Sequence, residues 1–208
     1  MRKSKADAAE SRKRILSAAS GIFLRDGIAA TAISDVMVAS GMTQGGFYRH
    51  FASKEQLVAE ATATAYDEII AALEAATSGK SPREAIDLII QQYLNQHAEP
   101  DFAPLCPLAN LSSELRLSDD QVKAAALEGY ARLVKLLASY LMRLDYIDYV
   151  GVAESIVSII VGAVAVSKVA VEPGMSESVL SNAQKTVNIL LQGSPTSPAL
   201  MMASARKR

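Results

Sequence analysis

The chain has 208 residues and a mass of 22.1 kDa, which suits one medium-sized domain or two small ones. Hydrophobic residues make up 50 % and charged residues 21 %, with a net charge of -1, so the composition is that of a soluble globular protein and excludes disordered and collagen-like classes. The single cysteine excludes an internal disulfide and a cysteine-rich zinc site. The first fourteen residues are polar and charged and do not resemble a secretory signal, which predicts a cytoplasmic protein.

Positive charge is concentrated near the start of the chain. The first 60 residues contain nine Lys or Arg and six Asp or Glu, whereas the remainder contains twelve and sixteen. A basic end on a nearly neutral chain is typical of proteins that bind an anionic partner such as DNA phosphate. A solvated terminal arm has the same composition, so charge alone leaves both interpretations open.

Apolar periodicity predicts helices throughout the first part of the chain, and no segment has the alternation of a strand. The first amphipathic helix ends at Gly27, as a C′ glycine. Three helices are then expected, two short and one long, over 33–40, 44–51 and 54–76.

The second half of the chain is also predicted to be helical. Ser81 and Pro82 are typical of an N-cap and the first residue of a helix. Helices are expected over 82–94, 107–115, 118–144, 150–171 and 176–192, followed by a disordered tail over 193–208. The helix at 150–171 is apolar on most sides, but only 155–167 is uncharged. That stretch is too short for a membrane span, which favours burial and a subunit interface.

The most informative stretch is Thr31–Leu57, which predicts two short helices joined by a tight turn at Gly41. Four residues are spaced to pack these helices together: Val36, Ala39, Met42 and Phe47. Thr43 is placed to cap the second helix, and its hydroxyl would also reach a phosphate. The second helix is expected to expose Gln44, Gly45, Gly46, Tyr48, Arg49 and His50. Two glycines on an exposed helix cost about 1 kcal/mol each relative to alanine, and close approach of the backbone to a partner would explain them.

This pattern resembles the TetR family of one-component transcriptional regulators over about residues 10–60. The matching positions are Thr31, Asp35, Val36, Gly41, Gly46, Phe47, Tyr48, His50, Phe51, Ser53, Lys54, Glu55 and Leu57. The chain departs from the family pattern at Ala32, where a Ser or Thr cap is usual, and at Met37, where alanine is usual. The resemblance implies phosphate contacts from Thr31, Thr43, Tyr48, His50 and Lys54. It implies contacts to base edges from Gln44, Gly45, Gly46 and Arg49, because the second helix of such a motif enters the major groove.

The resemblance also implies an architecture and a partner. It implies an all-α fold of about nine helices, with a three-helix DNA-binding domain over 1–53 and a ligand-binding and dimerisation domain over 54–192. The dimer would form through about 150–171 and 176–192 and bind a palindromic operator on double-stranded DNA, most often as a repressor. An inducer that binds one of two states better would release the DNA.

Cys106 precedes Pro107, which places it at the N-cap of a helix, where the dipole favours a thiolate. The segment around it resembles a TetR branch that includes the N-ethylmaleimide-responsive repressor and LmrA-type regulators, which implies an electrophile sensor with Lys168 close to the thiol. Two alternatives stay open: a buried cysteine acting as a small hydrophobe, or a thiol enzyme, which would need a histidine or second cysteine. Two histidines are too few for a His-rich metal site, and neither a metal nor a cofactor is expected.

Overall fold

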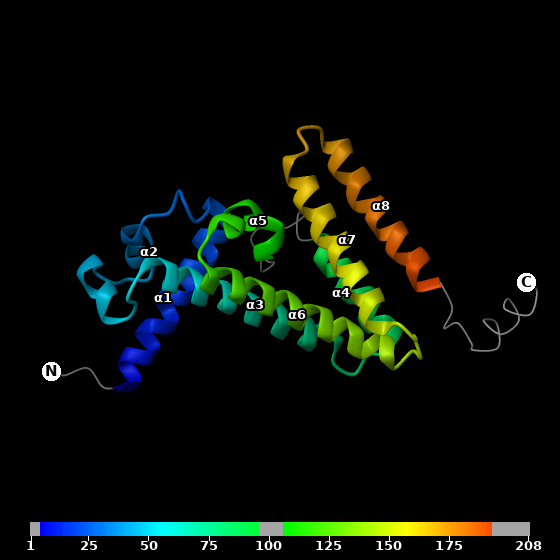
Figure 1. The fold of residues 1–208 in the computed structure, drawn as a ribbon, viewed down its shortest axis with the longest axis horizontal. Helices are drawn as coiled ribbons and strands as arrows, with labels where there is room; N and C mark the ends of the chain where they lie inside the picture. The colour runs from blue at the N-terminus through cyan, green and yellow to red at the C-terminus, as the bar shows by residue number, and fades with distance from the viewer. Residues whose placement is uncertain (1–4, 96–105, 193–208) are drawn as a thin grey trace, which may run out of the picture. The chain divides into compact units, whose positions relative to one another are not determined.

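The computed structural model describes residues 5–95 and 106–192, and within these ranges the chain forms nine helices and no strand (Figure 1). The expected all-α class is confirmed. The helices are α1 (Lys5–Asp26), α2 (Ile33–Ala39), the 3-10 helix η1 (Gln44–Arg49), α3 (Lys54–Thr77), α4 (Pro82–Leu94), α5 (Pro107–Leu117), α6 (Asp120–Met142), α7 (Tyr149–Val169) and α8 (Pro173–Gln192). The tail expected over 193–208 lies outside the described residues.

The described residues form two compact units. The first contains 5–69 and 106–130, and the second contains 70–95 and 131–192, so the boundary falls within α3 and α6. These units reflect packing, since α5 packs with the N-terminal helix α1 although it lies late in the chain. The expected functional division into 1–53 and 54–192 stays a prediction.

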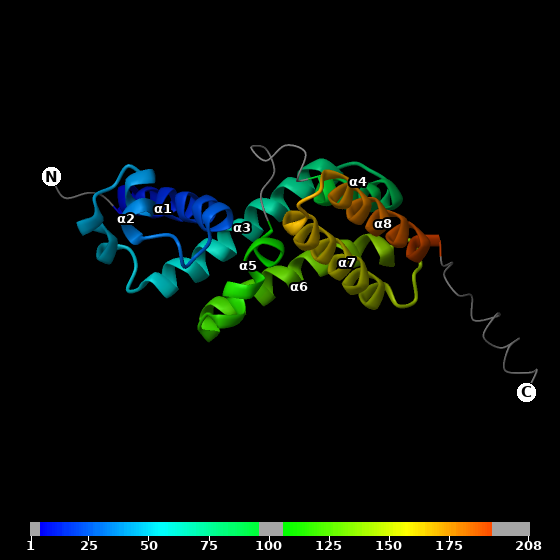
Figure 2. The same ribbon diagram turned by 90° about the horizontal axis from the view of Figure 1, so that it is seen from above.

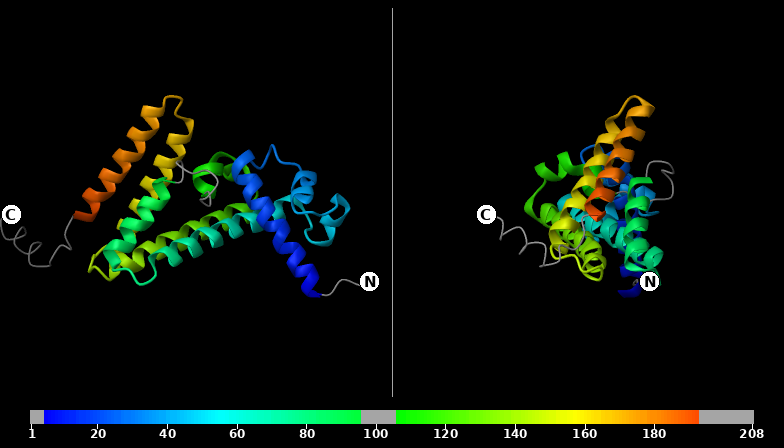
Figure 3. Two further views of the ribbon diagram at one scale, coloured as in Figure 1. Left: turned by 180° about the vertical axis from the view of Figure 1, so that it is seen from behind. Right: turned by 90° about the vertical axis from the view of Figure 1, so that its right-hand side faces the viewer.

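The first unit is built around one apolar core that gathers residues far apart in the sequence. Its buried members include Ile15, Phe23, Val36, Phe47, Phe51, Leu57, Leu111 and Leu115. Helix α5 supplies the last two and lies beside the C-terminal part of α1 (Figure 3). Because each side chain of this size contributes about 1.5–3 kcal/mol when buried, α5 is firmly attached to the N-terminal helices.

Two turns in this unit are made by glycines with a positive φ angle. Gly27 has φ of 92°, and its N–H donates to the carbonyl of Phe23 at 2.9 Å, which closes the end of α1. Gly41 has φ of 71° and forms the turn after α2. Other residues rarely adopt this conformation, so the predicted ends of both helices are confirmed at these positions.

Within the first unit, α3 and α6 approach each other closely at Gly129. A Cβ atom on Gly129 would lie 2.0 Å from Cδ2 of Tyr66, whose ring is fully buried. Carbon atoms in contact are normally about 3.5–4.0 Å apart. The absence of a side chain at Gly129 is therefore what makes room for the Tyr66 ring.

The second unit consists mainly of the antiparallel pair α7 and α8, and α4 packs against both (Figure 2). Ser81 caps α4 as expected: the N–H of Glu84 donates to Oγ of Ser81, and the N–H of Ser81 donates to the Glu84 carboxylate at 3.0 Å. Helix α8 begins at Pro173 rather than at the expected residue 176. Proline fits the first turn of a helix because its φ angle is already helical and no N–H is required there.

Helix α7 is long and apolar enough to cross a membrane by length and composition. The sequence argument against a span is therefore wrong, because a helix of 21 residues tolerates Glu154 and Lys168 near its ends. A single helix of this kind is equally typical of a protein core, and α7 packs against α4 and α8. Its buried residues are Ala153, Ile156, Val157, Ile160, Ala163, Val164 and Ser167.

Candidate nucleic-acid interface

The two-helix motif expected after Thr31 is present as α2, a turn and η1. The second helix is a 3-10 helix over Gln44–Arg49, not the expected helix over 44–51. Its hydrogen bonds include the N–H of Gly46 to the carbonyl of Thr43 at 2.9 Å and the N–H of His50 to that of Phe47 at 2.8 Å. Two adjacent glycines disfavour a regular α-helix, and the 3-10 form is common in such short pieces.

One side of η1 faces solvent, and the other is anchored in the core. The exposed residues are Thr43, Gln44, Gly45, Tyr48 and Arg49, while Gly46 and His50 are half-buried. The Tyr48 side chain is 75 % exposed. Phe47 is buried beneath it and stacks on Phe51, with 5.7 Å between the ring centroids. This arrangement exposes hydroxyl, amide and guanidinium groups on a helix that is anchored in the core. Groups of these types bind phosphates and the edges of DNA bases.

Two threonines differ from their expected roles. Thr43 stands at the N-cap of η1, but its side chain makes no capping hydrogen bond, so the expected cap is wrong and the exposed hydroxyl is available to an external partner. Thr31 is buried, and its hydroxyl donates to the carbonyl of Gly27 at 2.6 Å. In the structure its hydroxyl therefore holds the turn between α1 and α2, and the phosphate contact implied for Thr31 stays a prediction.

Lys54 holds the same turn from the start of α3. Its ammonium donates to the carbonyls of Ile28 and Thr31, both at 2.7 Å, and the residue is half-buried. A phosphate contact would compete with these two hydrogen bonds. The phosphate role implied for Lys54 stays a prediction, whereas its role in fixing the turn follows from the structure.

The packing between α2 and η1 uses Met37 rather than Ala39. Ala39 is exposed, whereas Met37 is fully buried, and its Cε lies 3.7 Å from the position of a Cβ on Gly46. The departure from the family pattern at Met37 therefore fills the space between the two helices. At the start of α2, Asp35 accepts from the N–H of Ala32 at 3.0 Å, which supplies a cap that alanine lacks.

An ion pair that the sequence did not indicate joins α1 to α3 behind the motif. The Arg12 guanidinium contacts both carboxylate oxygens of Glu60, with one N–H donating at 2.6 Å, and lies 4.6 Å from the centre of the Phe51 ring. The Arg12 hydrogen bond lowers the pKa of the Glu60 carboxyl. Because the partners are 48 residues apart, only the folded chain brings them together.

Cys106 stands at the N-cap of α5, as expected, but its side chain is almost fully buried. Its sulfur lies 4.0 Å from the hydroxyl of Tyr66. Burial raises the pKa of Tyr66, so the phenol stays protonated at neutral pH. Burial of the thiol agrees with packing as a small hydrophobe. Lys168, the expected partner, is an exposed residue of α7 in the second unit, and its pairing with Cys106 stays a prediction.

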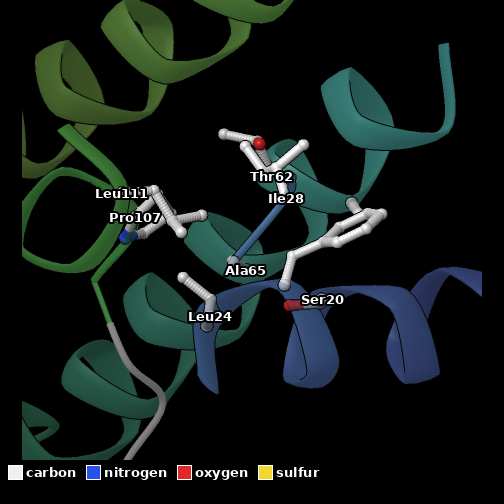
Figure 4. Close-up of a pocket in the computed structure, with 9 residues that line it drawn as sticks. Ser20, Leu24, Ile28, Thr62, Ala65, Pro107 and Leu111 are labelled. Atoms are coloured by element: carbon white, nitrogen blue, oxygen red, sulfur yellow. The ribbon is translucent and has the colours of Figure 1, made fainter. Parts of the chain in front are cut away.

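A small cavity lies where α1, α3 and α5 meet (Figure 4). Its volume is about 10 Å³, which is room for one water molecule and not for an inducer. It is lined by Ser20, Phe23, Leu24, Ile28, Ala61, Thr62, Ala65, Pro107 and Leu111. Among the residues that the structure describes, no three His, Cys, Asp or Glu side chains are grouped to hold a metal ion.

Two family models match the chain. One, described as bacterial regulatory proteins of the tetR family, matches residues 15–61 and so covers α2, the turn and η1. The other, described as the C-terminal domain of LmrA/YxaF-like transcriptional regulators, matches residues 82–186, about half of the chain. The chain belongs to the TetR family. The resemblance inferred from the motif and from the Cys106 segment is confirmed.

Similar proteins include an uncharacterized HTH-type transcriptional regulator of Mycobacterium tuberculosis strain H37Rv, 33 % identical over 115 residues, which are 55 % of this chain and 58 % of the relative. LmrA of Bacillus subtilis is 29 % identical over 126 residues, covering 58 % of this chain and 65 % of the relative. The chain thus spans less than two thirds of the length of each of these two relatives.

Solved structures share the TetR fold. Reduced NemR from E. coli has a TM-score of 0.75 at 21 % identity, covering 86 % of this chain and 95 % of that one. A TetR-family regulator from Cytophaga hutchinsonii has a TM-score of 0.76 at 20 % identity, covering 94 % and 100 %. At about 20 % identity, the likeness of these structures to this chain shows a shared fold and nothing about function.

Proposed function

We propose that this chain is a homodimeric, DNA-binding transcriptional repressor of the cytoplasm, released from a palindromic operator by a small molecule or by modification of Cys106. The observation that carries the proposal is the exposed side of η1, where Gln44, Tyr48 and Arg49 stand over the buried Phe47. Gln and Arg form bidentate hydrogen bonds with adenine and guanine edges, and Gly45 lets the backbone approach the groove. Thr43, Tyr48 and His50 would bind the flanking phosphates.

The two apolar helices of the second unit support the homodimer. Apolar side chains on α7 and α8 are 45–77 % exposed, and a second copy would cover them. They are Val150, Val166, Val169, Met175 and Ile189. Gly162 has open space around it, which would let a partner helix approach closely.

The position of Cys106 supports a route for release. Its thiol is enclosed between the start of α5 and Tyr66, so a covalent adduct has no room there without moving α5. A non-covalent inducer would act on the same equilibrium by binding better to the state that does not fit the operator.

DNA binding is tested by selecting a duplex from a random pool with the wild-type protein and measuring its Kd over a range of salt concentrations. A repressor with several phosphate contacts should lose affinity steeply as salt rises. Arg49→Ala should weaken binding by about 10- to 100-fold, since a bidentate base contact is worth roughly 1–3 kcal/mol. Arg83→Ala, which removes an exposed arginine from α4, is the matched control and should leave Kd unchanged. Failure of the wild type to select any duplex would refute the proposal.

The dimer and the release are tested separately. Val166→Glu should convert the dimer to a monomer in sedimentation equilibrium, whereas Val38→Glu, at an exposed valine of α2, should not.

N-ethylmaleimide should release the selected duplex from the wild type and not from Cys106→Ser if the thiol is the sensor. Equal responses of the two proteins would assign Cys106 to packing and release to a non-covalent ligand.

A further inference from the structure

The turn between α1 and α2 is held by hydrogen bonds from three directions. The Thr31 hydroxyl closes it locally on the Gly27 carbonyl, and the Lys54 ammonium binds two of its carbonyls from α3. The third comes from α5: the backbone N–H of Ala29 donates to Oε2 of Glu114 at 2.6 Å. This bond joins residues 85 positions apart, and the rest of the turn is held by groups of the helix-turn-helix region.

The Glu114 carboxylate fits closely over the turn. A Cβ atom on Gly27 would lie 2.9 Å from Oε1 of Glu114, so the carboxylate occupies the space where any other residue would place its side chain. Gly27 also has a positive φ angle. The two oxygens therefore have different roles, since Oε2 accepts a hydrogen bond from Ala29 while Oε1 packs against Gly27.

Glu114 is itself fixed by the packing of α5. Leu111 and Leu115, three residues before it and one after it, are buried in the core that also contains Ile15 and Phe23 of α1. Helix α5 begins directly after Cys106, and eight residues of helix place Glu114 about 12 Å along the axis from that end. A displacement of the start of α5 would be carried by a rigid helix to the turn that leads into α2.

We propose that Glu114 is a positioning residue for DNA binding, which fixes the turn 27–31 and through it the placement of α2 and η1. This rests on the proposed function, because it assigns to α5 the link between the regulated part of the chain and the DNA-reading motif. Loss of the bond between Ala29 and Glu114 leaves the motif folded but lets the turn, and the helix that follows it, move.

The test compares Glu114→Ala, Glu114→Gln and Glu128→Ala. Alanine removes the acceptor, whereas glutamine keeps an oxygen acceptor in a side chain of the same size. Glu128→Ala removes an exposed carboxylate from α6 in the same unit and is the control for net charge. The measurements are Kd for the duplex selected by the wild type, the dimer fraction, and amide hydrogen exchange over 27–33.

Glu114→Ala should weaken binding of the selected duplex by about tenfold and speed exchange of the Ala29 amide by a similar factor, with the dimer intact. Glu114→Gln should restore Kd to within about threefold of the wild type, because a neutral acceptor is weaker than a carboxylate but still bonds. Glu128→Ala should bind as the wild type does.

Equal Kd for Glu114→Ala and the wild type, or unchanged exchange at Ala29, would overturn the role of Glu114 while leaving the proposed function intact. Equal losses in Glu114→Gln and Glu114→Ala would overturn the hydrogen bond as its basis. A wild type that selects no duplex would overturn the proposed function and this role together.

Discussion

Replacing Gly129 with alanine should destabilise the protein, although the same change usually stabilises a helix. The new Cβ would lie 2.0–2.4 Å from three atoms of the Tyr66 ring, well inside the normal contact distance of about 3.5–4.0 Å. The Tyr66 ring is fully buried, so either the ring leaves its position or α3 and α6 move apart.

The expected change in the free energy of unfolding of Gly129→Ala is the sum of two opposing contributions. Alanine gains about 1 kcal/mol over glycine in a helix interior, and an extra methyl group in a packed core costs about 1–3 kcal/mol. Because the overlap at Gly129 is severe, we expect a packing cost in the upper part of its range, and a net loss of about 1–2 kcal/mol in the free energy of unfolding. Gly21→Ala in α1 is the matched control: no atom lies within 4 Å of its Cβ position, and it should gain about 1 kcal/mol.

The assay is urea unfolding of both variants and the wild type at one protein concentration, since the stability of a dimer depends on concentration. The two variants should differ by about 2–3 kcal/mol with opposite signs relative to the wild type. A Gly129→Ala protein that is as stable as Gly21→Ala would refute the inference that the gap at Gly129 is needed to seat Tyr66.

Three further predictions concern charged groups and a helix cap. Glu60→Gln should lower the free energy of unfolding by about 1 kcal/mol at pH 7. Because Arg12 lowers the pKa of Glu60 in the folded state, this difference should be full above the usual carboxyl pKa of 4.5 and vanish as the pH falls through the lower folded pKa. A difference between the two proteins that persists at pH 2 in urea titrations would contradict this reasoning. Lys54→Met should lower the free energy of unfolding by about 1–3 kcal/mol through loss of two partly buried hydrogen bonds. An unchanged salt slope of DNA binding would assign Lys54 to the turn, whereas a phosphate contact by Lys54 would make the slope fall by about one. Ser81→Ala should lower the midpoint of thermal unfolding, because it removes the N-cap of α4, which contributes about 1 kcal/mol. Ser113→Ala, on the exposed side of α5, is the control and should leave the midpoint unchanged. Equal midpoints for the two variants would show that the cap does not stabilise the protein.

The candidate interface was largely predictable because its signals are local. The residue pattern of Thr31–Leu57 predicted the motif and the exposed residues of its second helix. Gly27 and Gly41 indicated turns whose positive φ angle few other residues adopt. The glycines at 45 and 46 were recognised as unusual, but the 3-10 form of the helix that contains them was not predicted from the sequence.

The sequence by itself determined the all-α class, the helix-turn-helix and the N-cap positions of Ser81 and Cys106, because periodicity and caps depend on residues within one or two turns of each other. Only the tertiary structure decided that Thr31 is buried, that Lys54 binds carbonyls, and that Glu114 reaches Ala29. These contacts join segments 23 to 85 residues apart, and a side chain's partner across such a distance is set by the packing of the core rather than by its neighbours in the chain.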